Sequence, residues 1–581
     1  MYDNLKEKDW LTLIDNRFKS SDTVWSVINK TYERNLNIYK NEPAWLENVS
    51  VKKSRVRANR IFRDMESVIN GLIANPPKPN IIAGRDTDES KELAIQQEKY
   101  FVEKYSELNI KEEFRKGLRN LYFGRLMVIK PFWNAKKNDF DAKALDPRKV
   151  RISKSATNTE DSEFAIEEVT DNLMSVITRF PGKEDKILAK SGLDKAKALL
   201  ENPEITYQEA WIQNYTVFKY AGMILEVIKN PYWDWDGILL SEEEDDVLND
   251  EKSTKAQRRS TLEQAREQQD ERVTQEGVSL NSYYFNHFDE VRKPYIVATI
   301  LNNEDSPIGQ TDFITQAAPL QENVDKRKRQ IDENAEIVNG IIKVDESVMS
   351  KANAQKLRFD TGGVIWGKGV ANGVQRETGS PLPQFVFDDM QDSRNEIDNI
   401  MAATSAFRGE REGQETKAGR LALIEQSFLN LNELVQVVDY VSYELFNWFY
   451  QLAKIKYTEH HYAKTIGSEN AVDILTLIQD DFEDGTEVRI IPGKTLPEDK
   501  QWKFEMAQAD IQAGLLAPTD YFKFAGYESP AELAENRLEY DSGIALQKLQ
   551  TDQASQLPLP TTQEGIGILS SNFDQAAQPQ S

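Results

Sequence analysis

A single long helix, predicted over residues 420–455, is the feature that most limits how this chain of 581 residues can fold. Apolar side chains recur at every third or fourth position, which is the period of an α-helix, and no proline or glycine interrupts them. These positions are Leu421, Ile424, Phe428, Leu431, Val435, Val438, Leu445, Phe449 and Leu452. At about 1.5 Å per residue the helix would be roughly 50 Å long. A helix of that length suits the wall of a ring or bundle better than the interior of a compact enzyme.

The charged loop before this helix, residues 404–419, carries three basic and three acidic side chains, and Arg420 follows it. The basic residues of this stretch are Arg408, Arg411, Lys417 and Arg420. One interpretation is a surface loop with no special role. The other is a flexible finger that touches a phosphate backbone, weakly because its acids nearly cancel its bases. The residues alone leave both interpretations open.

Composition limits the classes of protein to which this chain can belong. Its formal net charge of −24 argues against a protein that coats nucleic acid with a basic surface. It does not argue against a channel through which DNA slides, because a like-charged wall repels phosphate. The chain has no cysteine and three histidines, which leaves little for disulfides, thiolate metal sites or imidazole chemistry. We expect two to four domains in a soluble protein made in a cytosol, since there is neither an apolar signal core nor a membrane-length apolar run.

Residues 1–306 are predicted to contain helices followed by antiparallel strands. Helices are expected over residues 10–18, 23–39, 58–73 and 89–122, the last with a break near Asn109. Strands are expected at 125–133 and 140–145, in a hairpin at 215–220 and 223–228, and at 282–288 and 294–300. Residues 241–277 hold twelve acidic and six basic residues, which favours a solvated helix or an insertion loop.

The second half of the chain is predicted as two helices around a small β-rich module, followed by the long helix. The first helix, 307–339, has Pro319 at its start or at a kink and carries the basic cluster 326–329. Short strands are expected at 341–344, 356–359, 363–366 and 384–387, and a second helix over 389–403 with Asp388 as its N-cap. Beyond the long helix we expect a strand at 487–491, helices beginning near 497 and 529, and a disordered tail from residue 553.

Three short motifs are too incomplete to define a site. Residues 362–368 spell most of a phosphate-binding loop, but Gly369 stands where a magnesium-binding Ser or Thr belongs, so a turn is favoured. Tyr232 occupies the first ligand position of a calcium-loop-like stretch, which favours a hairpin turn there. His460 and His461 are adjacent, so their side chains point apart, and no third ligand is apparent. We therefore expect no catalytic residue, no metal and no cofactor.

The order of the predicted elements resembles the portal protein family, the head-to-tail connectors of tailed double-stranded DNA bacteriophages. That order is a helix, a β-rich module, a second helix, a charged loop, a very long helix, a strand and a small helical end. Two local stretches also resemble the family: Leu118–Gly124 followed by a strand hairpin and Leu145–Val150, and Val488–Pro492 followed by Leu496–Lys500. The likeness covers residues 55–545 and includes no short catalytic signature.

The resemblance implies an α+β, mainly helical subunit with wing, stem, clip and crown regions and a long kinked helix that lines a ring channel. The implied regions are the wing (1–306), stem helix 1 (307–340), the clip (341–387), stem helix 2 (388–403), the tunnel loop (404–419), the channel helix with return strands (420–495), the crown (496–552) and a disordered tail (553–581). The acidic insertion 241–277 and the short crown depart from many members.

The function that the resemblance implies is a non-enzymatic DNA conduit at one vertex of the virion. It would assemble in the host cytoplasm as a homo-oligomeric ring, usually of twelve subunits, through which double-stranded DNA passes without sequence specificity. Its protein partners would be the terminase large subunit, the major capsid protein and a head–tail adaptor, with no membrane involved. The DNA contacts would come from Arg408, Arg411, Lys417 and Arg420. The clip contacts with motor or adaptor would come from Lys343, Lys356, Arg358, Trp366 and Lys368.

Two other functions remain as alternatives at this point. One is a DNA-packaging ATPase or nuclease, against which the defective loop at 362–369 and the lack of a convincing metal cluster weigh. The other is a structural scaffold oligomer without a channel, which the sequence does not separate from a connector.

Overall fold

The computed structural model describes most of the first 491 residues. The described residues are 2, 5–47, 49, 53–74, 76–233, 257, 260, 261, 264, 287, 288, 290–302, 307–309, 311–338, 341–356, 366, 368–377, 381–403, 431–466, 472–482 and 485–491. All of them belong to one compact unit, Met1–Pro497. The predictions for the tunnel loop, the crown and the tail lie outside the described residues, as do those for nearly all of 241–277.

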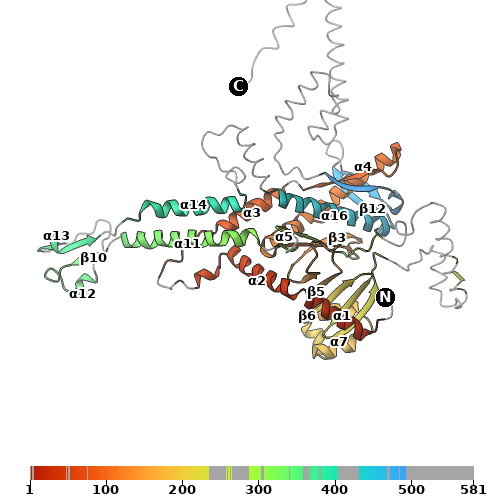
Figure 1. Ribbon diagram of the computed structural model, residues 1–581, viewed down its shortest axis with the longest axis horizontal. Helices are drawn as coiled ribbons and strands as arrows, with labels where there is room; N and C mark the ends of the chain where they lie inside the picture. The colour runs from red at the N-terminus through yellow and green to blue at the C-terminus, as the bar shows by residue number, and fades with distance from the viewer. Residues whose placement is uncertain are drawn as a thin grey trace, which may run out of the picture. The chain divides into compact units, whose positions relative to one another are not determined.

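Five helices open the chain, close to where they are predicted (Figure 1). They are α1 (Glu7–Ser20), α2 (Asp22–Tyr39), α3 (Arg60–Leu72), α4 (Asp88–Glu107) and α5 (Ile110–Gly124). The predicted break near Asn109 is confirmed: this residue has a φ of +55°, a left-handed conformation that asparagine tolerates, and it separates α4 from α5.

Two antiparallel sheets follow these helices. The three-stranded sheet has the order β3-β2-β9, with β2 at Leu126–Asn134, β3 at Asp139–Leu145 and β9 at Ile296–Thr299. The five-stranded sheet runs in chain order through β4 (Val150–Ile152), β5 (Phe164–Asn172), β6 (Glu204–Ile212), β7 (Tyr215–Tyr220) and β8 (Met223–Lys229). Three short helices lie between β5 and β6: α6 (Leu173–Arg179), α7 (Glu184–Ser191) and α8 (Lys195–Glu201). The predicted hairpin at 215–228 is confirmed, and it turns through Ala221 and Gly222 at positive φ.

A buried cluster of charges joins the two sheets. Lys130 of β2 places its Nζ atom 2.6 Å from Glu167 of β5 and 2.7 Å from Glu209 of β6. The same ammonium donates to the hydroxyl of Tyr295, which in turn donates to Glu167. Burial by itself would raise the pKa of Glu209, but the ammonium of Lys130 outweighs burial and holds that pKa below its ordinary value. We call these four residues the Lys130 cluster.

The long helix α16, Asn432–Lys456, lies at the centre of the core. Its apolar side chains, among them Val441, Leu445 and Phe449, are buried in one cluster with residues of α4, α5, β2 and β3. The prediction of a long helix is confirmed over this range, whereas residues 420–430 lie outside the described part of the chain. Buried positions occur on more than one side of α16, which explains why it lies inside the unit rather than on its surface.

Two further antiparallel strand pairs, β1 with β14 and β12 with β13, include strands from the C-terminal part of the described chain. Strand β14, Glu487–Ile491, is confirmed, and it pairs in antiparallel fashion with β1, Lys78–Ile82. The hairpin of β12 (His461–Ile466) and β13 (Val472–Leu477) lies within 420–495, the range to which the resemblance assigns return strands without giving their bounds. The predicted strand at 294–300 is confirmed as β9, and most of 282–288 lies outside the described residues.

The two helices around the β-rich module differ in their bounds from the prediction. Helix α11 spans Phe313–Val338 and therefore begins before Pro319, which lies inside it. Helix α14 spans Gln384–Ile400, so the predicted strand at 384–387 is wrong and Asp388 is not an N-cap. Val386, Ser393 and Ile397 are buried at helical spacing. Val386 belongs to the stretch 384–387, whose alternating side chains resemble a strand. Pro383 is the N-cap residue of α14, and Pro381 lies two residues before it.

Replacing Lys130 with Met should destabilise the fold by about 3–5 kcal/mol, because it removes the cation that compensates two buried carboxylates. The folded pKa of Glu209 lies below its ordinary value. The stability that the pairing supplies is therefore full above about pH 4.3, the ordinary pKa of a glutamate, and is lost as the pH falls through the folded pKa. Denaturant unfolding at pH 7 and at pH 3.5 would measure both effects.

The matched control is Lys143→Met, because Lys143 is exposed and lies opposite Lys130 in the β2–β3 register. Its replacement should change stability by less than about 0.5 kcal/mol. Equal losses in the two variants would contradict the role given to the Lys130 cluster.

Candidate functional site

An antiparallel pair of helices, α11 and α14, carries the residues that sequence analysis assigns to the stem. Asn323 of α11 donates to Asp389 and Ser393 of α14, and Arg327, one turn further along α11, pairs with Asp389 at 2.6 Å. Advancing along α11 thus moves the contact backwards along α14. Of the basic cluster 326–329, Arg327 is used in this internal contact, while Lys326 is exposed.

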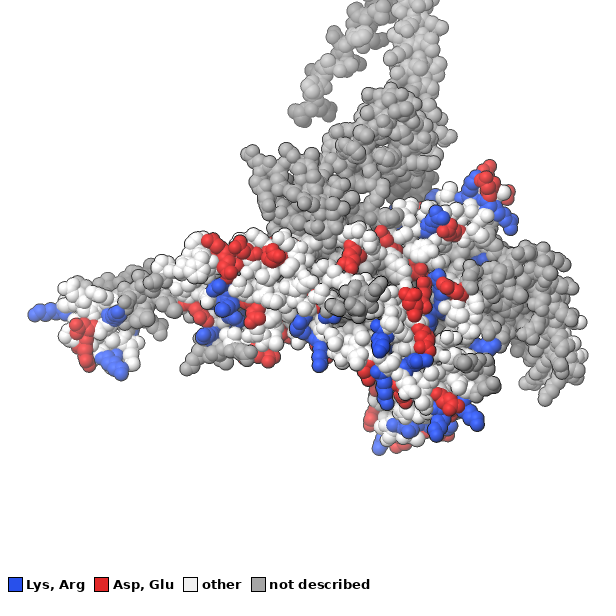
Figure 2. Space-filling view, viewed as in Figure 1, with Lys and Arg blue, Asp and Glu red and all other residues white. Residues whose placement is uncertain are grey.

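The outer surfaces of this helix pair differ in charge. Figure 2 shows acidic side chains over α14 and, below them, basic side chains with acidic ones among them over α11. On α14 the exposed acids follow one helical face, at Asp388, Asp392 and Glu396. On α11, none of the described side chains at 326–335 is buried. The pair therefore has long polar surfaces that the described chain does not cover.

A small β-hairpin module lies between the two helices in sequence. Strand β10, Ile341–Val344, begins three residues after α11 ends, and it pairs with β11, Val374–Glu377, which ends shortly before α14. Two short helices, α12 (Lys351–Ala354) and α13 (Val370–Gly373), complete the described part of the module. Gly373 packs so closely on Val348 that a Cβ atom there would lie 2.3 Å from a methyl carbon of that side chain.

The predicted clip residues are exposed where the structure describes them. Lys343 lies on β10, Lys356 in a turn after α12 and Lys368 just before α13. The side chain of Trp366 is 94% exposed, more than any other large apolar side chain among the described residues. A tryptophan this exposed is unusual unless a partner covers it. Arg358, the fifth predicted clip residue, lies outside the described residues.

The four bases predicted to contact DNA, Arg408, Arg411, Lys417 and Arg420, lie outside the described residues. The segment that leads to them is well anchored. Arg60 of α3 makes a bidentate ion pair with Asp398 of α14, with N–O distances of 2.9 and 2.7 Å. The neighbouring Ile397 and Met401 are buried in the main core. The end of α14, just before residue 404, is therefore held in a fixed position on the main core.

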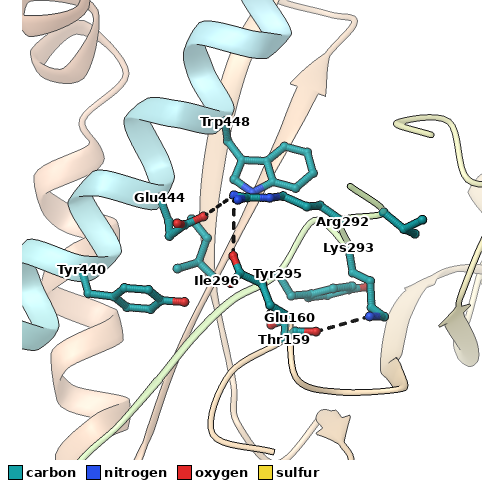
Figure 3. Close-up of a pocket in the computed structure, with 10 residues that line it drawn as sticks. Thr159, Glu160, Arg292, Lys293, Tyr295, Ile296, Tyr440, Glu444 and Trp448 are labelled. Atoms are coloured by element: carbon teal, nitrogen blue, oxygen red, sulfur yellow. Dashed lines mark hydrogen bonds and ion pairs between the residues drawn. The ribbon is translucent and has the colours of Figure 1, made fainter. Parts of the chain in front are cut away.

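A second cluster of polar residues, which sequence analysis does not identify, surrounds a small cavity beside α16 (Figure 3). The cavity measures about 20 Å³, room for roughly one water molecule. Arg292 lies 2.9 Å from Glu444 of α16, 3.3 Å from Glu290 and 3.6 Å from Glu160. We call Glu160, Glu290, Arg292 and Glu444 the Glu444 cluster. The one sequence signal for it is an acid within an otherwise apolar stretch of the long helix.

Burial changes the acidity of two groups at this cavity. Burial raises the pKa of Glu444 to about 7, because the lowering effect of Arg292 is offset by Glu160 and Glu290. Burial also lowers the pKa of Lys293, which donates to the backbone carbonyls of Ser162 and Thr159 at 2.8 and 3.3 Å. The lining holds both signs of charge and lacks the space for a substrate, so a catalytic assignment has no support.

The weak sequence motifs do not come together into a site. Most of the phosphate-loop-like stretch lies outside the described residues, and Gly369 adopts a left-handed conformation with a φ of +83°. Tyr232 packs against Trp211, His287 and Trp448 as an aromatic core residue. His461 stacks on Tyr457 with ring centroids 3.7 Å apart. Across the described residues, no group of three or more His, Cys, Asp or Glu side chains is placed to hold a metal ion.

Comparison with known proteins does not identify a family for this chain. No protein-family model matches it, and no curated protein sequence matches it significantly. None of the described helices combines the length and apolar character that a membrane span requires.

Replacing Ile397 with Ala should destabilise the protein by about 2–5 kcal/mol, because its fully buried side chain fixes α14 to the core. The neighbouring exposed Glu396 provides the control, and Glu396→Ala should change stability by less than about 0.5 kcal/mol. Thermal unfolding measures both variants. A similar melting temperature for I397A and the wild type would show that α14 does not depend on this contact.

Proposed function

We propose that this chain is a portal-type subunit, in which copies form a ring around a channel for double-stranded DNA. The observation that carries the proposal is the antiparallel α11–α14 pair, which brackets an exposed hairpin module and is followed in the chain by the long helix α16. This is the order of stem, clip, stem and channel helix that the sequence resemblance implies. The α+β class of the chain, with more helix than strand, is compatible with it.

The surfaces of the helix pair support assembly with further copies. A ring needs two different, complementary sides on each subunit. The acidic face of α14 and the basic cluster 326–329 of α11, in which Lys326 is exposed, are opposite in charge. Such exposed ion pairs contribute little individually, so they would set the register between copies more than the strength of the ring.

The hairpin module is the proposed docking surface for the packaging motor and later for a tail adaptor. Trp366 presents an apolar ring that is suited to bury itself in a partner's pocket, and Lys343, Lys356 and Lys368 would form a charged rim around it. Arg358 belongs to the same proposal by its position in the sequence.

The charge of the chain supports passage rather than retention of DNA. A ring multiplies the net charge of −24 per subunit into a strongly negative object, which repels phosphate. Arg408, Arg411, Lys417 and Arg420 would provide brief contacts along an otherwise repulsive path.

The test of the proposal is the mass of the assembled particle together with a negative-stain image of it. We expect a closed ring of many subunits with a central hole of duplex width. An oligomer without a hole would favour a structural scaffold, and a monomer that hydrolyses ATP or cuts DNA would favour a packaging enzyme. Either result would replace the portal assignment.

Replacing the four loop bases with Gln should reduce DNA packaging or retention while ring formation stays intact, because only the phosphate contacts are removed. Packaging of DNA into capsids, scored against particle mass, measures this. The control replaces Lys195 and Lys197 of α8, far from these bases in sequence, with Gln. Normal packaging in the loop variant would contradict the assignment of the loop.

Replacing Trp366 with Ala should weaken binding of the motor by about tenfold or more, the usual effect of losing an aromatic anchor, without lowering the melting temperature. Phe385→Ala provides the control, since Phe385 is also exposed but lies on α14 outside the module. Equal binding by W366A and the wild type would remove Trp366 from the docking surface.

A further inference from the structure

One cation in the Glu444 cluster faces three carboxylates. The guanidinium of Arg292 is within 3.6 Å of Glu444, Glu290 and Glu160. The next cation in the chain, Lys293, is directed to backbone carbonyls and does not pair with these acids. When all three acids are ionised, the cluster has more negative than positive charge in a partly buried place. Binding of one proton would relieve this excess of negative charge, and the proton would bind to the carboxylate whose charge is least well solvated.

Glu444 is the member whose charge is least well solvated. Its side chain is 8% exposed, against 42% for Glu160 and 63% for Glu290, so water stabilises its charge least. The other groups near it do not reverse this preference. Tyr440 of α16 stays neutral because burial raises its pKa, and Asp161 in the loop beside Glu160 adds a further negative charge.

The cluster also joins three parts of the fold that are distant in sequence. Glu444 belongs to α16, Arg292 to the segment that leads into β9, and Glu160 to the loop between β4 and β5 (Figure 3). The segment is held to the same loop by a hydrogen bond from the Thr159 hydroxyl to the carbonyl of Tyr295. A hydrogen bond of 2.9 Å from the Arg292 guanidinium to the Glu444 carboxyl group joins α16 to this junction, and a neutral carboxyl group can accept it as well.

We propose that Glu444 is a proton-controlled latch that holds α16 against residues 290–296 when it is neutral and loosens this contact when it ionises. The folded pKa of Glu444, about 7, is above the ordinary value, so the folded state binds the proton more tightly than an opened state does. Local stability therefore falls as pH rises from the ordinary glutamate pKa to the folded pKa, and levels off above it.

Hydrogen–deuterium exchange of the full-length protein, followed by mass spectrometry, tests the latch. After correction for intrinsic exchange, peptides from α16 and from residues 290–299 should open about tenfold more at pH 8 than at pH 6. Peptides from α6–α8 should not change. Glu444→Gln, which keeps the side chain neutral, should hold the opening of α16 constant over this range.

Two further variants separate the latch from a general effect of charge. Glu433→Gln changes an acid of the same helix, whose carboxylate accepts the N–H of Leu301, and it should keep the wild-type pH dependence. Glu290→Gln removes one neighbouring negative charge, so the transition should move to lower pH even if E444Q fails to fold. A flat wild-type profile, an E444Q profile that still changes tenfold, or an unshifted E290Q transition would each overturn the proposal.

Discussion

The arrangement of the two sheets depends on the ion pairs that the Lys130 ammonium makes with Glu167 and Glu209. These two acids lie on two strands of the five-stranded sheet, while Lys130 itself belongs to the three-stranded sheet. Apolar contacts alone would allow the sheets to slide, because they have little directional preference. Charged hydrogen bonds in a buried place allow few geometries, since any other leaves a carboxylate without its partner. The position of Tyr295, and with it the start of β9, follows from the same constraint.

Position in the fold separates the helices of this chain into two kinds. The helix α16 buries side chains on several sides and contributes to the core, and burial raises the pKa of Glu444, its one buried acid. The pair α11 and α14 buries side chains only where it meets the body or the other helix. The proposed ring and the proposed latch thus depend on opposite properties. The first depends on helix surface that the described chain leaves exposed, and the second on a charge that the core encloses.

Strong local patterns made much of the fold predictable from the sequence. The apolar period of 432–456, the left-handed turn at Asn109 and the turn at Ala221 and Gly222 are signals carried by neighbouring residues. The strand predicted at 384–387 was wrong because four residues cannot distinguish alternation from the start of a helix. The hairpin of β12 and β13 is local, but no turn signal of the kind seen at Ala221 and Gly222 was recognised between its strands. The Glu444 cluster was missed for another reason, because it depends on contacts between segments far apart in the chain. Of the candidate site, exposure of Trp366 was compatible with the sequence interpretation, while the loop bases remain a prediction.

The pairing of β1 with β14 has a consequence for synthesis of the chain on the ribosome. Residue 487 is translated about 400 residues after residue 82, which takes roughly 20–80 seconds at 5–20 residues per second. During that time β1 has an edge without its native partner, which is the kind of edge that recruits foreign strands. The nascent chain carries its own protection, because Pro79 lacks an N–H group and Lys78 adds a charge. The short length of β1, its proline and its charged residue thus limit pairing with foreign strands until β14 has been translated.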